Sequence, residues 1–315
     1  APGQTIYLME GTYNLSQTVR IERGIDGTKD KRIYLLVDPD AKSRPVFDFG
    51  GKCEGVILAG DYWYLKGFDV TRSQNGKDGI RVCGEYNVLE QMNTYKNGNT
   101  GIQISRYLGS DLWDNWPRYN LILNCTSYLN ADSGYEDADG FAAKLTVAEG
   151  NVFDGCIAAY NADDGWDLFA KVETGEIGSV MIKNSIAYKN GYVLVKDGEL
   201  SLDGEEVSAG NGNGFKLGGT SLFSHPDYAP YHHTVQNCAA FYNKAKGIDS
   251  NSCPNIQAIN SVSFNNESYN VAYYTNVAAD TDYVSKGLIS FRTDFLTVGD
   301  QMTLASKKPD NAQKM

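Results

Sequence analysis

Asn124-Cys125-Thr126-Ser127-Tyr128-Leu129-Asn130 is one copy of a motif, N-C-x-x-Y-x-N, that recurs from near residue 70 to near residue 270. A motif that returns at a nearly fixed period indicates a repeat architecture, in which each repeat builds one structural unit and stacks on the next. The seven copies run from Phe68 to Asn75, Gln91 to Asn97, Asn124 to Asn130, Gly155 to Asn161, Asn184 to Asn190, Asn237 to Asn243 and Asn260 to Asn266.

The last asparagine of each copy defines a column of equivalent positions, called the Asn column below. Short apolar runs such as Leu121-Ile122-Leu123 and Val180-Met181-Ile182 precede the copies. They are too brief for helices and are bounded by turn residues, which is typical of strands. One coil per repeat with about three strands, stacked about 4.8 Å apart, is a parallel β-helix. We therefore predict an all-β solenoid with a stacked ladder of Asn75, Asn97, Asn130, Asn161, Asn190, Asn243 and Asn266.

A glycine follows the Asn column by four residues in most coils, as at Gly79, Gly101, Gly165 and Gly247. Glycine is the default residue for a left-handed backbone turn. Two coils depart from this spacing: six extra residues precede Gly140 and twenty precede Gly214. Because loops of a rigid scaffold carry function, we expect these insertions to wall one side of a groove.

Alignment on the glycines brings four aspartates together. Asp139 and Asp164 directly precede their glycines, Asp163 precedes Asp164, and Asp167 comes two residues after Gly165. Carboxylates this close repel one another unless they are protonated or bridged by a cation, and ligation by oxygen alone suits calcium. The competing interpretation is that these residues only form turns, since Asp and Gly are common turn residues. Four aspartates in register favour a calcium site.

Lys216 stands two residues after Gly214, in the same column as Asp167 and one coil away. A nearby divalent ion destabilises an ammonium group and lowers its pKa, which would make Lys216 a candidate general base. An ordinary solvated or ion-paired lysine is the alternative. If the twenty-residue insertion shifts the register, Lys183, Lys189 or Lys196 could compete for the same role.

Four more polar residues occupy these columns on the flanking coils and are candidates for substrate contacts: Arg81, Gln103, Lys246 and Asp249. Trp166 lies between Gly165 and Asp167, so it points to the opposite side from Asp167 and is expected in the core.

The composition limits the other possibilities. The net charge of -11 argues against nucleic acid as a partner, and no apolar run is long enough for a membrane span. Even composition without a linker predicts a single domain over residues 1–315. The six cysteines form no C-x-x-C pair, and the stacking of Cys125, Cys156 and Cys238 favours buried thiols. The start at Ala1-Pro2-Gly3 shows no initiator Met or signal peptide, so the expected secretion rests on function.

The segments Asp139-Gly140-Phe141, Asn161 to Asp167 and Asn213-Gly214-Phe215-Lys216 resemble the motifs of polysaccharide lyase family nine, from Thr5-Ile6-Tyr7 to about residue 275. The resemblance implies a right-handed parallel β-helix and a pectate or rhamnogalacturonan lyase. It also implies calcium at Asp139, Asp163, Asp164 and Asp167, with Lys216 as the base. The expected substrate is an acidic pectic polysaccharide, polygalacturonate first, cut by β-elimination by a monomeric enzyme.

Two rival functions remain open from the residues alone. A β-helical glycoside hydrolase would use the clustered carboxylates as acid and base, with water as the nucleophile and no need for the lysine. A noncatalytic carbohydrate-binding β-helix would use calcium only to join neighbouring coils.

Overall fold

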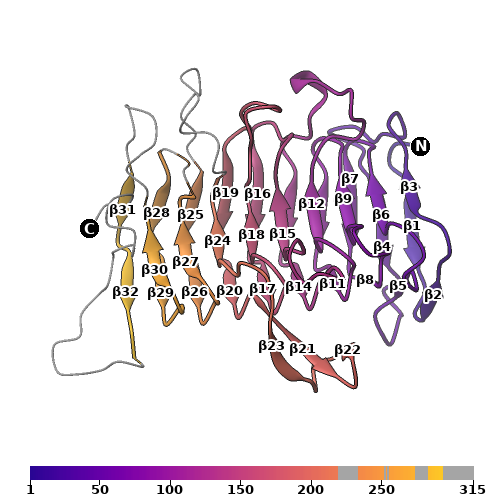
Figure 1. Cartoon of the computed structure of the whole chain (residues 1–315). Helices are drawn as coiled ribbons and strands as arrows, with labels where there is room; N and C mark the ends of the chain where they lie inside the picture. The colour runs from indigo at the N-terminus through magenta and orange to yellow at the C-terminus, as the bar shows by residue number, and fades with distance from the viewer. Residues whose placement is uncertain (219–232, 252, 254, 274–282, 294–315) are drawn as a thin grey trace.

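Three long parallel sheets wind into one stack of coils in the computed structural model of the chain (Figure 1). The structure describes residues 1–315 except 219–232, 252, 254, 274–282 and 294–315. Each coil contributes one short strand to each sheet, except that the last coil, with β31 and β32, has no third-sheet strand among the described residues. Equivalent strands of neighbouring coils pair in parallel. The predicted parallel β-helix is confirmed. The prediction of a single domain extends into residues outside the described ones.

The three sheets are named first, second and third in the order in which the chain enters them. The first sheet contains β1 (Thr5–Leu8), β4 (Ile33–Val37), β7 (Trp63–Lys66), β10 (Val88–Glu90), β13 (Leu121–Leu123), β16 (Asn151–Asp154), β19 (Val180–Lys183), β25 (Thr234–Gln236), β28 (Gln257–Ile259) and β31 (Val284–Lys286). The second sheet contains β2 (Thr12–Asn14), β5 (Val46–Asp48), β8 (Asp69–Thr71), β11 (Asn93–Tyr95), β14 (Thr126–Tyr128), β17 (Ile157–Ala159), β20 (Ile186–Tyr188), β26 (Ala239–Phe241), β29 (Val262–Phe264) and β32 (Ile289–Phe291).

The third sheet carries the candidate site. It contains β3 (Val19–Ile21), β6 (Val56–Leu58), β9 (Ile80–Val82), β12 (Ile102–Ile104), β15 (Phe141–Ala143), β18 (Trp166–Asp167), β24 (Phe215–Lys216), β27 (Lys246–Asp249) and β30 (Tyr269–Ala272). Successive side chains of a strand point to opposite faces, so each of these strands sends one set inward and one outward. Inside, Trp166 is fully buried and stacks between Phe141 and Phe215, with ring centroids 4.8 and 4.9 Å away. The expectation that Trp166 belongs to the core is confirmed.

The Asn column forms the predicted ladder from Asn97 to Asn266. At each step the side-chain amide donates to the side-chain oxygen of the next asparagine, as from Asn190 Nδ2 to Asn243 Oδ1 at 3.0 Å. Backbone amides also donate to these oxygens, so buried polar groups that no water reaches find partners along the stack. The members linked in this way are Asn97, Asn130, Asn161, Asn190, Asn243 and Asn266.

Asn75 does not belong to this ladder, and the prediction for it was wrong. Strand pairing sets Thr71 opposite Tyr95, which places Ser73 level with Asn97, and the Ser73 amide donates to Asn97 Oδ1 at 3.2 Å. Asn75 lies two residues farther on, exposed to solvent. The corner before Gly79 is therefore two residues longer than the usual spacing of four, and counting back from the glycine chose the wrong residue.

A second ladder, which the sequence analysis missed, stabilises the corner before the first sheet. Asn87, Asn120 and Asn151 are buried at equivalent positions, and Asn120 Nδ2 donates to Asn151 Oδ1 at 2.9 Å. The signal was an asparagine directly before β10 and β13, or opening β16, in three consecutive coils.

The two insertions lie beside each other. The longer one forms a small antiparallel sheet of β21 (Tyr192–Lys196), β22 (Glu199–Leu200) and β23 (Glu205–Ser208), which projects from the stack in Figure 1. Residues 134–137 of the shorter insertion and residues 208–211 of the longer one enclose a hollow of about 500 Å³.

The cysteines and the helices of the chain can also be compared with the predictions from the sequence. Cys125, Cys156 and Cys238 are buried free thiols, as expected from their stacking. The described residues include one short 3-10 helix, η1 (Trp113–Asn115). Within the described part of the chain, no helix has the length and apolar character needed to cross a membrane.

Candidate active site and metal centre

The outward-facing residues of the third sheet form a row along the stack, called the outer row below. Strand pairing joins each member to the next, across both insertions, as Gln103 with Ala142 and Asp167 with Lys216. The register predicted from the glycines is therefore confirmed, and the long insertion does not shift it. The outer row contains Arg81, Gln103, Ala142, Asp167, Lys216 and Asp249.

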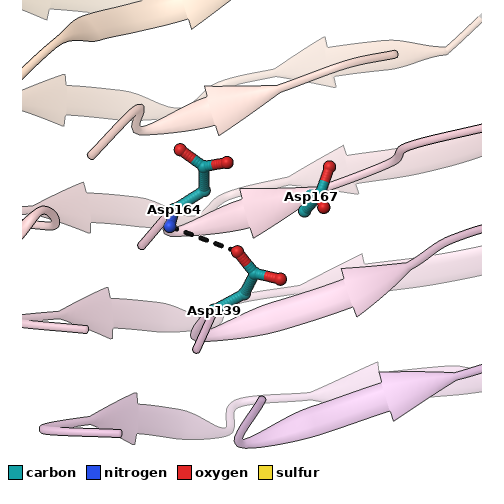
Figure 2. A group of neighbouring side chains, drawn as sticks. All are labelled: Asp139, Asp164 and Asp167. Carbon is teal, nitrogen blue, oxygen red and sulfur yellow. Dashed lines mark hydrogen bonds between the residues drawn. The ribbon is translucent and has the colours of Figure 1, made fainter. Parts of the chain in front are cut away.

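Three aspartates meet in the middle of this row. Asp139 and Asp164 come at the corners that enter β15 and β18, and Asp167 ends β18. Carboxylate oxygens of all three lie within 4.8 Å of one another, and all three residues are buried (Figure 2). We call these three residues the Asp cluster. The sequence placed them together correctly because each sits at a fixed offset from a glycine that repeats in the coil.

Amide donors hold the Asp cluster in place but reach only some of its carboxylate oxygens. The Asp164 amide donates to Asp139 Oδ1 at 3.2 Å, as Figure 2 shows. The backbone and side-chain amides of Asn213 both donate to Asp164 Oδ1, at 2.7 and 2.8 Å. By contrast, Asp164 Oδ2 and Asp167 Oδ1 are buried and accept no hydrogen bond from an amide or hydroxyl group. Their positive partner is Lys216, whose ammonium nitrogen lies 2.9 Å from Asp164 Oδ2 and 3.6 Å from Asp167 Oδ1.

The carboxyl groups show the electrostatic cost of this arrangement. The pKa of Asp139 is raised to about 7: burial is the largest cause, Lys144 opposes the shift, and the neighbouring Asp167 and Asp164 add to it. Burial likewise raises the pKa of Asp164. A bound cation would reverse these shifts by favouring the ionised forms. Three buried carboxylates whose oxygens lie within 4.8 Å of one another fit a hard divalent ion such as calcium.

Asp163 stands apart from the Asp cluster, although the sequence grouped it there. Its side chain turns toward the long insertion, where Oδ1 accepts the Asn211 backbone amide at 2.7 Å. Burial raises the pKa of Asp163 to about 9, with further contributions from Asp164 and Asp139. Its assignment as a fourth metal ligand stays a prediction.

Lys216 lies against the Asp cluster. Its ammonium nitrogen is 2.9 Å from Asp164 Oδ2 and 3.6 Å from Asp167 Oδ1. Burial lowers the pKa of Lys216, but the surrounding carboxylates, Asp167 first, raise it more, so the lysine is held in its charged form. Of the competing lysines, Lys183 pairs with Asp154 on the first sheet, Lys189 pairs with Glu206, and Lys196 is exposed at the end of β21.

A second lysine, which the sequence analysis missed, also contacts the Asp cluster. Lys144 follows β15, and its ammonium nitrogen lies 2.6 Å from Asp139 Oδ2 and 3.2 Å from Asp167 Oδ2. Burial lowers the pKa of Lys144, and Asp139 and Asp167 raise it more, so it too stays charged. The signal was the two-residue alternation of strands, which puts Lys144 on the same face as Ala142.

The predicted substrate contacts lie on the flanking coils. Arg81 pairs with Glu54 at 2.8 Å, and Gln103 Nε2 donates to Ser105 Oγ at 3.2 Å. On the other side of the cluster, Lys246 pairs with Asp249 at 2.7 Å. Arg81, Gln103 and Asp249 share the outer row with Asp167 of the Asp cluster, so one extended ligand along the row could reach them.

A family model described as "Pel9A-like, right handed beta helix region" matches residues 1–281 of this chain. Two similar proteins are called pectate lyase L. The one from Thermoclostridium stercorarium is 43% identical over 292 residues, which are 93% of this chain. The one from Paenibacillus polymyxa is 44% identical over 280 residues, or 87% of this chain. The matched part spans only 22% and 58% of these two relatives.

Solved structures agree on the fold. The crystal structure of pectate lyase Pel9A has a TM-score of 0.72 and 31% sequence identity, covering 97% of this chain and 74% of that chain. A rhamnogalacturonan lyase has the same TM-score of 0.72 with 24% identity, covering all of this chain and 79% of the other.

Proposed function

The chain belongs to polysaccharide lyase family nine, the Pel9A-like right-handed β-helices, and on this premise we propose that it is a calcium-dependent pectate lyase. It would cleave polygalacturonate, an acidic pectic polysaccharide, by β-elimination. One observation carries the proposal: a buried cluster of Asp139, Asp164 and Asp167 stands beside Lys216 on one outer row. An acidic cation site next to a lysine provides what elimination from a uronic acid needs.

Elimination begins with loss of the proton at C5 of a galacturonate unit, next to its carboxylate. Lys216 is the proposed acceptor, because it pairs with Asp167 in the outer row and its side chain, beside Asp164, keeps 14% of its surface exposed. As the C5–H bond breaks, its electrons form the C4–C5 double bond and the C4–O bond breaks. The leaving oxygen then takes up a proton, so the net change moves one proton from C5 to that oxygen.

Asp139, Asp164 and Asp167 would hold the calcium ion, and we retain Asp163 as a proposed fourth ligand. When bound, calcium would neutralise the aspartate charge that keeps Lys216 protonated and would stabilise negative charge on the substrate carboxylate. Asn213 positions Asp164 through two hydrogen bonds, which fixes one ligand relative to Lys216. Arg81, Gln103, Lys246 and Asp249 are proposed contacts for sugars on either side of the reacting one.

The polymer is too large to enter a cell, so we also propose that the protein is secreted. The stack completes its site within one chain, which favours a monomer.

The test is ultraviolet absorbance of the new double bond during incubation with polygalacturonate, with calcium and then with a chelator. A calcium-dependent rise supports the proposal. A rise only on rhamnogalacturonan would change the substrate, while reducing ends released without absorbance would mean hydrolysis. Silence on both polymers would favour a noncatalytic β-helix.

A further inference from the structure

We propose that Lys144 is shared between the Asp cluster and the substrate: a divalent cation displaces its ammonium group from Asp139 and Asp167, and the released group binds a carboxylate of the pectic chain. The inference rests on the proposed function and assigns a substrate-binding residue that the repeat pattern did not reveal.

The contacts show why Lys144 and a metal ion would compete. Lys144 and Lys216 each approach a different oxygen of Asp167, Oδ2 at 3.2 Å and Oδ1 at 3.6 Å. Lys144 also takes Asp139 Oδ2 at 2.6 Å. A divalent ion held by Asp139, Asp164 and Asp167 needs the same oxygens, and its charge repels a neighbouring ammonium group. Of the two lysines, Lys144 holds the closer contact with Asp167 and the shortest contact in the cluster.

The backbone at Lys144 is fixed, so the side chain is the part that can move. The amide of the next residue, Leu145, donates to the Phe169 carbonyl at 2.7 Å. Thr146 Oγ1 accepts the Arg106 backbone amide at 3.1 Å. The Lys144 side chain keeps 18% of its surface exposed and has a flexible four-carbon stem. It can therefore leave the cluster toward solvent without disturbing the coil.

The outer row has a gap where Lys144 would act. At the coil between Gln103 and Asp167 the row carries Ala142, which has no polar side-chain atom. Lys144 comes two residues later on the same face. Neighbouring strands lie about 4.8 Å apart, so a sugar chain that crosses the Asp cluster and continues toward Gln103 must pass this coil. Lys144 is the cationic group placed to meet it there.

Two other cations near the row, Arg81 and Lys246, have carboxylate partners outside the Asp cluster. Arg81 pairs with Glu54 and Lys246 pairs with Asp249. A metal ion in the cluster would leave these pairs intact but would release Lys144. The ammonium group of Lys144 would thus become available to the substrate carboxylate only when the metal ion is bound.

The first test compares Lys144→Met with Lys66→Met, a control that removes a single ion pair, Lys66 with Glu90, on the first sheet. Calorimetric titration with calcium alone should show several-fold tighter binding to Lys144→Met. The KM for polygalacturonate should rise about tenfold, with a smaller change in kcat, as expected for loss of a charge-assisted contact. Lys144→Arg, which keeps the charge, should restore most of the KM.

Tighter calcium binding together with a higher KM distinguishes a substrate-binding role of Lys144 from a structural one. If Lys144 only held the Asp cluster together, Lys144→Met would weaken calcium binding, and unchanged KM would also overturn the proposal. The proposed function fails differently: the wild-type protein would then show no calcium-dependent elimination at all.

A second measurement uses the wild-type protein and so does not depend on how the variant folds. Lysines are acylated briefly with an amine-reactive ester, and labelling at Lys144 and Lys66 is compared by mass spectrometry. Calcium should increase labelling of Lys144 relative to Lys66, and a galacturonate oligomer added with calcium should reverse the increase. If calcium does not change the labelling of Lys144, the proposed displacement of its ammonium group by the metal ion is wrong.

Discussion

The Asn ladder and the Asp cluster are built by the same device and reach opposite results. Both stack polar side chains at equivalent positions of neighbouring coils, and both are buried. An amide carries a donor and an acceptor, so Asn190 can donate to Asn243 and accept from Asn161 in the same stack. A carboxylate only accepts, so Asp139 and Asp164 cannot satisfy each other. Stacked asparagines therefore stabilise the fold, while stacked aspartates create a demand for cations.

The contrast between the Asn ladder and the Asp cluster is tested most strongly at Lys216, which contacts the Asp cluster. Lys216→Ala should lower kcat on polygalacturonate by about a hundred- to ten-thousandfold, the usual contribution of a general base. The melting temperature in calcium should change little, because the ion would still neutralise the Asp cluster. Initial rates of absorbance increase, measured beside Lys66→Ala, provide the check. A variant that keeps a tenth of the activity would remove Lys216 from the reaction.

The Asp cluster and Lys216 could be predicted from the sequence because the repeated glycines fix the alignment of neighbouring coils. Gly140, Gly165 and Gly214 pack where a side chain would meet backbone of the next coil or an asparagine amide within 3 Å, so the alignment cannot slip. Asp139, Asp164, Asp167 and Lys216 follow from that register.

Other features depend on contacts that the register does not specify. Lys144 lies two residues beyond the outer row on the same face, and its contact with the Asp cluster depends on the reach of a long side chain to Asp139. Asp163 is drawn to the Asn211 amide of the long insertion, whose path the repeat does not encode.

The next prediction concerns the uncharged structure, the Asn ladder. Asn190→Ala should lower the free energy of unfolding by about 3 kcal/mol, because it leaves buried partners such as Asn243 Oδ1 and the Ala158 carbonyl with fewer bonds. Urea unfolding measures the loss. The kcat of the folded variant should stay at the wild-type value. A loss below about 1 kcal/mol would mean that the ladder adds little to stability.

Asp78 tests what burial alone does to a carboxyl group, because it is buried but lies outside the Asp cluster. Burial raises the pKa of Asp78 from 3.8 to about 7. Between about pH 4 and pH 7 the folded protein retains a proton that the unfolded chain has released, so stability falls as the pH rises through this window. Asp78→Asn cannot ionise and should be about 2 kcal/mol more stable than wild type at pH 8.

Urea unfolding of Asp78→Asn at pH 5 and pH 8, in chelator, measures this effect. Asp40→Asn, on an exposed turn, is the matched control. Equal pH dependence in wild type and Asp78→Asn would show that the carboxyl group does not titrate in this window.

Asn75 gives the smallest expected effect and tests where the ladder begins. Its Oδ1 accepts one bond, from the Ser133 amide at 2.6 Å, at an exposed position where water can replace it. Asn75→Ala should therefore cost less than about 1 kcal/mol in urea unfolding. Ser73→Ala should cost more, since the buried Ser73 Oγ donates to the Lys77 carbonyl and accepts the Gly98 amide. The reverse order would return Asn75 to the column, because only a buried ladder position loses partners that water cannot supply.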